Sequence, residues 1–183
     1  MLQGLMVVCG TGTLATSLAG CGSASESPQK IIASSGGEFT DAHRVFLTQL
    51  SDILIPQTDT PGAVIAGAAQ KVELVLSDML PDDERAKWLN GLDEIHTVLD
   101  TRVGGNFLKA SQANQTNAVK KLDRAAYAEN STAPKAYRTI KKALATAYYY
   151  SEPGATEELR YDPVPGDWRA CVPFSEIGRT WAT

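Results

Sequence analysis

The spacing of apolar residues between Phe39 and Tyr150 is the feature that most constrains the fold of this chain. These residues recur three and four positions apart, which places them on one face of an α-helix. Proline and glycine interrupt the pattern at intervals, and no run of β-branched residues alternates with polar ones as a strand would require. The sequence therefore predicts an all-α fold, an irregular bundle of about five helices around one core.

The first predicted helix follows Thr40, whose side chain suits an N-cap. We expect it to end at Pro56, which cannot continue a helix. His43 lies in its first turn and is expected to be solvated. The face toward the core should carry Ala42, Phe46, Leu50, Ile53 and Leu54. A turn-rich loop follows, with Asp59, Thr60, Pro61 and Gly62 in sequence.

Four further helices are predicted from similar signals. The second runs from about Ala68 to Met79. The third begins after Pro81 with three acidic residues and stops at Gly104-Gly105. Ser111 opens the fourth and Pro134 the fifth. The residues expected to face the core are Val72, Val75, Leu76 and Met79 in the second helix, Trp88, Leu92, Ile95 and Leu99 in the third, and Val119, Leu122, Tyr137, Ile140, Leu144 and Tyr148 in the last two.

Length and composition argue against most catalytic classes. With 183 residues the chain suits one domain, and its 17 basic and 21 acidic residues give a net charge of −4, which offers no overall attraction to nucleic acid or anionic lipid. No complete dinucleotide fingerprint, phosphate-binding loop or haem-attachment motif occurs. His43 and His96 cannot form a multi-histidine metal site. We therefore expect no catalytic, cofactor-binding or metal-binding residue, and we expect Lys120-Lys121 and Lys141-Lys142 to be ordinary solvated pairs.

The N-terminal segment indicates export. Residues 1–20 are apolar, rich in small residues and too often interrupted for a membrane-spanning helix, so they are interpreted as a lipoprotein-type signal peptide. Leu18-Ala19-Gly20-Cys21 looks like a lipobox, which predicts acylation of Cys21 and membrane anchoring in the periplasm. Residues 21–38 would form a flexible tether and residues 39–183 the helical domain. No basic residue precedes Lys30, although such a signal needs a positive N-terminal region, so either the natural start lies upstream or the signal is defective.

The last thirty residues are predicted to form a separate arm. Pro163 and Pro165 exclude a regular helix there. Its aromatic residues argue for an ordered arm, packed either on its own domain or on a partner. These aromatic residues are Tyr161, Trp168, Phe174 and Trp181. Cys171 would be the one thiol left after export and acylation. Two interpretations stay open for it: a buried inert thiol, or a disulfide between subunits.

Several short elements, read together, carry a resemblance to a known family. They are Ile53-Leu54-Ile55-Pro56, then Thr58-Asp59-Thr60-Pro61-Gly62-Ala63, then Tyr148-Tyr149-Tyr150-Ser151, and finally Tyr161-Asp162-Pro163-Val164-Pro165-Gly166. In this order they resemble the gluconate 2-dehydrogenase subunit 3 family, over roughly Phe39 to Trp181. Members of that family are small, exported helical subunits that accompany a large flavoprotein of the glucose-methanol-choline oxidoreductase type, often with a multihaem cytochrome c as a third partner.

The resemblance implies that catalysis and FAD belong to the partner, while this chain stabilises, escorts or anchors it. The interface expected on this interpretation consists of Asp59, Pro61, Tyr161, Pro165, Trp168, Phe174 and Trp181. Two alternatives remain open. The chain could be a stand-alone periplasmic lipoprotein that binds a ligand or another protein, or it could be an independent enzyme.

Overall fold

The computed structural model describes residues 38–164, 166 and 171–182, and these residues form a helical protein. Five long helices occur in this part of the chain: α1 (Asp41–Leu54), α2 (Ala68–Asp78), α3 (Asp82–Val103), α4 (Gln112–Ala126) and α5 (Ala136–Tyr149). Shorter elements are a 3₁₀ turn, η1 (Phe107–Lys109), a π-turn, η2 (Gly154–Glu158), and α6 (Phe174–Ile177). No strand is present over the described ranges, so the predicted all-α fold is confirmed.

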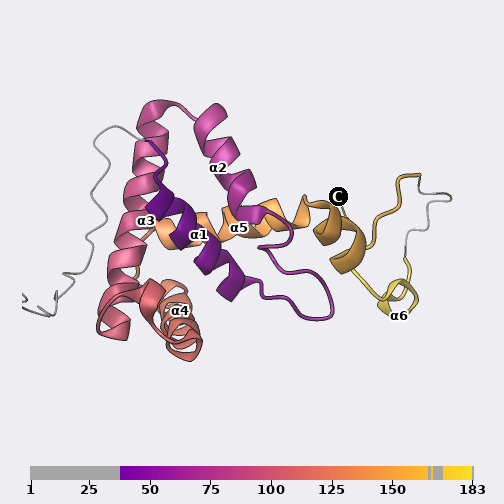
Figure 1. The fold of residues 1–183 in the computed structure, drawn as a ribbon. Coiled ribbons are helices and arrows are strands. Elements are labelled where there is room, and N and C mark those ends of the chain that lie inside the picture. Colours follow the sequence, from indigo (N-terminus) through magenta and orange to yellow (C-terminus); the bar gives the residue numbers. More distant parts are fainter. Residues whose placement is uncertain (1–37, 165, 167–170, 183) are drawn as a thin grey trace, which may run out of the picture.

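The long helix α3 forms one side of the molecule, and the other long helices pack against it or against each other (Figure 1). α3 contacts α1, α4 and α5, while α2 lies on α1 and α5. All five contribute to one main core cluster, whose fully buried members include Phe46, Leu92, Phe107, Leu122 and Ile140. None of the helices in the described part of the chain is long and apolar enough to cross a membrane.

The predicted helix boundaries rest on capping chemistry that the structure contains. The Thr40 hydroxyl accepts a hydrogen bond from the backbone N–H of His43, and the Ser111 hydroxyl accepts one from Asn114. Gly104 ends α3 in the left-handed conformation, with φ of 72°. Its backbone N–H donates to the last turn of the helix, as a glycine at this position commonly does.

The prediction that His43 is solvated and Ala42 buried was wrong, because the core face of α1 includes His43 and Leu47 beside the predicted Phe46 and Leu50. His43 is fully buried and Ala42 is exposed. The imidazole belongs to a capping box: its Nδ1 accepts from the backbone N–H of Thr40 at 3.2 Å. Its Nε2 lies 2.9 Å from Asp93 Oδ1. The ring is therefore inward because both nitrogens have partners there.

The inward face of α2 was also only half predicted. Val72 and Leu76 are buried, but Val75 is 46% exposed and Met79 is 74% exposed. α2 is a surface helix that contacts α1 and α5 on one side, and Ala68 and Ala69 complete its buried face. Val75 and Met79 are rotated away from that contact, so apolar character alone did not identify the buried positions.

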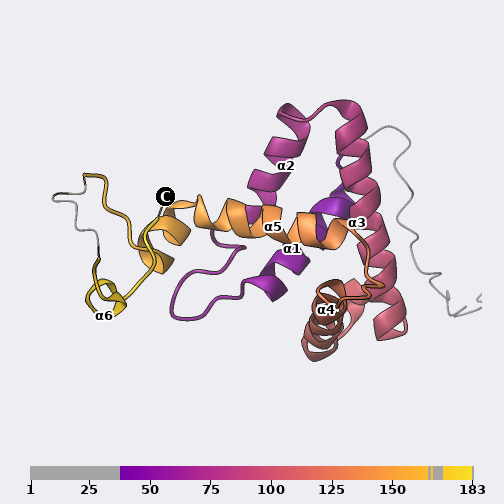
Figure 2. The same cartoon turned by 180° about the vertical axis from the view of Figure 1, so that it is seen from behind.

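Beyond α5 the chain leaves the bundle. The segment after η2 extends past the C-terminal end of α5, on the side away from α3 and α4, in both views (Figures 1 and 2). We call residues 160–182 the arm. Neither hydrophobic core cluster includes a described residue of the arm.

Candidate functional site

The loop between α1 and α2 is closed on itself and on α5. The backbone N–H of Ala63 donates to the carbonyl of Ile55 at 2.9 Å, which joins the two ends of the loop. The hydroxyl of Tyr148 donates to the carbonyl of Pro61 at 2.9 Å. Tyr148 is 2% exposed and packs with Ala63 in a second small hydrophobic cluster, so burial raises the pKa of its hydroxyl. The loop is thus held by the end of α5.

Gly62 is required by this closure. A Cβ at this position would lie 2.6 Å from the backbone nitrogen of Gln57 and 2.9 Å from the carbonyl oxygen of Ile55. Both are backbone atoms, so a side chain here would displace the loop. The Pro61-Gly62 pair therefore allows the close approach of the two ends of the loop.

The π-turn η2 is held against the end of α5 in a similar manner. The hydroxyl of Ser151, which is buried, donates to the carbonyl of Tyr148 at 2.5 Å and accepts from the backbone N–H of Gly154 at 3.1 Å. A Cβ on Gly154 would overlap with the carbonyl oxygen of Tyr148. The turn that follows α5 therefore needs both a glycine at position 154 and the hydroxyl of Ser151.

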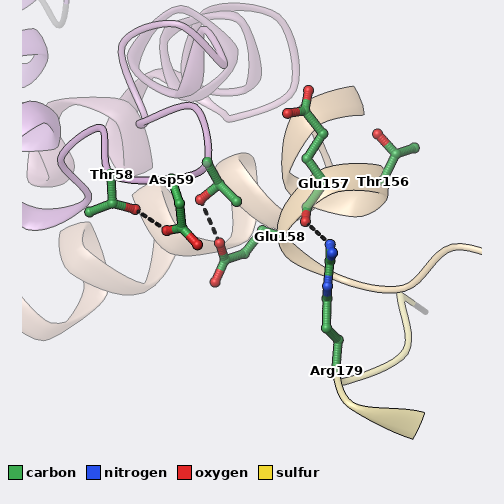
Figure 3. Close-up of a pocket in the computed structure, with 7 residues that line it drawn as sticks. Thr58, Asp59, Thr156, Glu157, Glu158 and Arg179 are labelled. Atoms are coloured by element: carbon green, nitrogen blue, oxygen red, sulfur yellow. Dashed lines mark hydrogen bonds between the residues drawn. The ribbon is translucent and has the colours of Figure 1, made fainter.

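The loop, the π-turn and the arm together line a pocket of about 650 Å³ (Figure 3). Its lining side chains are three threonines, three acids and one arginine: Thr58, Thr60, Thr156, Asp59, Glu157, Glu158 and Arg179. The hydroxyl of Thr60 donates to Glu158 Oε2 at 2.7 Å, and Arg179 donates to the backbone carbonyl of Glu157. These two contacts connect the loop to η2 and η2 to the arm. The pocket has an excess of negative charge.

The arm is tied at its base. The backbone N–H of Arg160 donates to the carbonyl of Thr180, and that of Ala182 donates to the carbonyl of Arg160, both at 2.8 Å. These bonds form an isolated parallel bridge between Arg160 and Trp181. The Arg160 guanidinium also lies 4.3 Å from the centre of the Trp181 ring, a cation–π contact. We call the bridge and this cation–π contact together the clasp.

Large side chains of the arm are exposed to solvent. Tyr161 is 57% exposed, Phe174 66% and Trp181 40%. These side chains therefore do not pack against the chain's own core, which was one of the two arrangements expected from the sequence. Cys171 is a free, exposed thiol, so the expectation of a buried thiol was wrong. Pro165, Trp168 and Cys21 lie outside the described residues.

A second polar cluster lies inside the bundle, between α1 and α3. His96 is 5% exposed, and its ring packs edge-on against Phe46. Burial lowers the pKa of His96, while the carboxylates of Asp100 and Asp93 act in the opposite direction and His43 acts with the burial. Nδ1 of His96 lies 3.6 Å from Asp100 Oδ2, beyond hydrogen-bond distance. No group of three or more metal-ligating side chains occurs in the part of the chain that the structure describes.

The model of one known protein family matches most of the chain. The model of the family described as gluconate 2-dehydrogenase subunit 3 matches residues 41–166, more than half of the chain. The chain belongs to this family. The subunit 3 match includes the five long helices, the closed loop, Tyr148 and the π-turn. Searches of curated proteins and of solved structures each found no match.

The closed part of this site was singled out from the sequence, whereas its acidic side was predicted only at Asp59. The loop and Tyr148 had been singled out from the sequence, and the subunit 3 match now covers both. Glu158 and Arg179 had not, because Thr60 and Glu158 are 98 positions apart. The one signal for Glu158 was the acidic pair Glu157-Glu158 after Pro153-Gly154. The subunit 3 match ends within the arm, so Phe174 and Trp181 lie beyond it.

Proposed function

We propose that this chain is a non-catalytic accessory subunit that stabilises, escorts or anchors a periplasmic FAD-dependent dehydrogenase of the glucose-methanol-choline type. FAD would be bound by the partner, and a multihaem cytochrome c could complete the complex. The observation that carries the proposal is the arm: a member of a subunit family holds large aromatic side chains outside its own core, in a segment that is tied at its base.

Interface energetics explain why such side chains would be kept exposed. Aromatic anchors dominate binding energy when a partner's pocket covers them, at about 2 kcal/mol or more each. Phe174 and Tyr161 are more than half exposed, and neither belongs to the core, so the fold of the chain gains little from them. The clasp and Pro163 restrict the free arm, which reduces the entropy lost on docking.

The closed loop would supply the second part of the docking surface. Asp59 is exposed, and its carboxylate accepts a hydrogen bond from the hydroxyl of Thr58 at 3.0 Å. Pro61 is fixed through its carbonyl by Tyr148. Thr60 in the loop bonds Glu158, and Arg179 in the arm bonds the carbonyl of the preceding residue, Glu157. The loop and the base of the arm therefore form one continuous surface. A partner can meet this surface without moving the helices.

We further propose that the mature chain is held at a membrane in the periplasm through acylated Cys21. The lipobox Leu18-Ala19-Gly20-Cys21 and the Ser-rich segment after it support this. Cys171 is exposed next to the anchors of the arm, so it is the residue to test for a disulfide with the partner.

The direct test is purification of the chain from its native host, with mass spectrometry of co-purifying proteins and a flavin absorbance scan. We expect a large flavoprotein in a fixed ratio. Recovery of the chain alone, or with proteins that carry no flavin, would favour the stand-alone lipoprotein. Turnover of a sugar by the purified chain without any partner would show an independent enzyme.

Variants of the arm test the docking surface itself. Phe174→Ala and Tyr161→Ala should each weaken partner binding by about 2 kcal/mol and leave the thermal midpoint of the isolated chain unchanged. Met79→Ala is a control, because Met79 is also a large exposed apolar residue, at 74%, but lies at the C-cap of α2. A chain ended after Leu159 should remain cooperatively folded and lose the partner. Full binding by that truncated chain would remove the arm from the interface.

A further inference from the structure

Basic charge is concentrated in one part of this acidic protein. Between positions 120 and 142 lie seven of the chain's 17 basic residues and two of its 21 acidic residues, Asp123 and Glu129. The basic residues are Lys120, Lys121, Arg124, Lys135, Arg138, Lys141 and Lys142. We call them the basic face. A net charge of −4 for the whole chain therefore conceals two regions of opposite sign.

The fold brings these residues together from two helices. Arg138 of α5 donates to the carbonyl of Ala126 at the end of α4, and Lys141 bonds Asp123 at 2.5 Å. Tyr127, 57% exposed, has the Arg138 guanidinium 4.9 Å and the Lys141 ammonium 5.1 Å from its ring centre. The last turns of α4 and the first turns of α5 are thus neighbours around one exposed tyrosine.

Each of the two helices carries a further basic residue one turn away from this tyrosine's neighbours. Lys120 precedes Arg124 by one turn on α4, and Lys142 follows Arg138 by one turn on α5. All four are exposed. Each of the two helices therefore presents a pair of cations, one turn apart, to solvent.

Most of these cations have no acidic partner among the described residues, unlike several cations on α1 and α3. In the described residues, Lys141 is the one member of the basic face that forms an ion pair. On α1 and α3, by contrast, Arg44 pairs with Asp41 and Glu73, and Lys87 pairs with Asp83 and Glu84. Lys71 and Arg102 also form no ion pair within the described ranges, but they stand singly, whereas six cations without one lie between positions 120 and 142.

We propose that the basic face is a contact surface for an anionic phospholipid membrane. Clusters of four to eight lysines and arginines are typical of such contacts, and each cation close to the surface contributes about a fivefold factor in affinity. Tyr127 fits the same role, because tyrosine has an apolar ring and a polar hydroxyl suited to the membrane–water interface. A lipid surface is fluid, so it can neutralise separate flexible side chains that no single pocket brings together.

An acidic protein surface is the competing occupant, and the geometry favours it less. Specific protein interfaces concentrate their energy in a few well-packed pockets. Three pockets of the described residues are lined by other parts of the chain. The basic face is also at the opposite end of α5 from the arm (Figure 2). α5 is about 21 Å long, so membrane contact leaves the arm free for a protein partner.

This inference goes beyond the proposed function, since it concerns electrostatic contact of the folded chain and needs neither acylation nor a flavoprotein. The test uses the full chain carrying Cys21→Ala, sedimented with vesicles of mixed phosphatidylglycerol and phosphatidylcholine. We expect binding to these vesicles, none to phosphatidylcholine alone, and loss of binding between about 0.1 and 1 M salt, where the Debye length shortens from about 10 to 3 Å.

Two triple variants with the same change in net charge locate the contact. Lys120→Gln, Arg124→Gln and Lys142→Gln together should lower the partition coefficient by about a hundredfold. The matched control, Arg44→Gln, Lys71→Gln and Lys87→Gln, changes cations outside the basic face and should stay within about twofold of the parent chain, with circular dichroism checking that both are folded.

The results that would overturn the inference are distinct from a failure of the proposed function. Equal loss in both triple variants would assign the effect to overall charge. Binding to pure phosphatidylcholine that survives high salt would assign it to apolar insertion. Absence of vesicle binding, together with loss of a co-purifying protein in the first triple variant alone, would assign the basic face to an acidic protein partner.

Discussion

Gly62→Ala tests whether the loop before α2 is as tightly closed as the structure has it. The added Cβ would meet the nitrogen of Gln57 at 2.6 Å, the carbonyl carbon of Pro56 at 2.8 Å and the carbonyl oxygen of Ile55 at 2.9 Å. The backbone has to separate, which stretches the 2.9 Å hydrogen bond from Ala63 to Ile55. Overpacking costs about 1–3 kcal/mol and a weakened hydrogen bond about 1 kcal/mol. We therefore expect a loss of about 2–4 kcal/mol in the free energy of unfolding.

Urea unfolding followed by circular dichroism measures this loss, and the thermal midpoint should fall by roughly 5–15 °C. Gly105→Ala is the control, because a Cβ there meets nothing within 4 Å and the residue is not in the left-handed region. It should change the free energy of unfolding by less than about 0.5 kcal/mol. Equal stability of the two variants would refute the close approach on which the description of the loop depends.

Four further predictions concern single side chains. Cys21→Ala should move the chain from the membrane to the soluble fraction of its own host, and a native chain that is already soluble would contradict the lipid anchor. Asp59→Ala should change stability by less than about 0.5 kcal/mol and lower assembly, with turnover per assembled flavin intact; a large loss of turnover would place Asp59 in an active site. Tyr148→Phe should cost about 1–3 kcal/mol, because it leaves the Pro61 carbonyl without its donor, while Tyr149→Phe should be near neutral. Burial lowers the pKa of His96 in the folded chain, so the unfolded chain binds more protons below pH 6.5. The free energy of unfolding should therefore fall as the pH drops from 6.5 to the lowered pKa. His96→Gln should flatten this part of the plot of urea midpoint against pH.

Local signals allowed much of the fold to be predicted. A hydroxyl at Thr40 or Ser111 and a glycine at Gly104 act on the backbone within one turn, so they define helix ends without reference to the rest of the molecule. The core-facing position of Tyr148 was also predicted correctly from the helical period, in which the next two positions point in other directions. Tyr148 is buried, whereas Tyr149 and Tyr150 are exposed.

Properties that depend on a distant partner were not predictable in the same way. His43 is buried because Asp93, fifty positions later, offers a partner for its ring. Val75 is exposed because α2 is covered on one side by α1 and α5, which the period of a single helix cannot reveal. The acidic side of the pocket depends on the contact between Thr60 and Glu158, and the arm on that between Arg160 and Trp181. Each of these is a long-range pairing with no local signature.

The clasp brings both ends of the arm to one point of the body. A segment that departs and returns at the same place can be shortened, extended or exchanged while the elements on either side keep their positions. The residues between Arg160 and Trp181 thus form a cassette, inserted after the helices that stabilise the protein. Mutations that change which partner is bound can then accumulate in the cassette without destabilising the helical bundle.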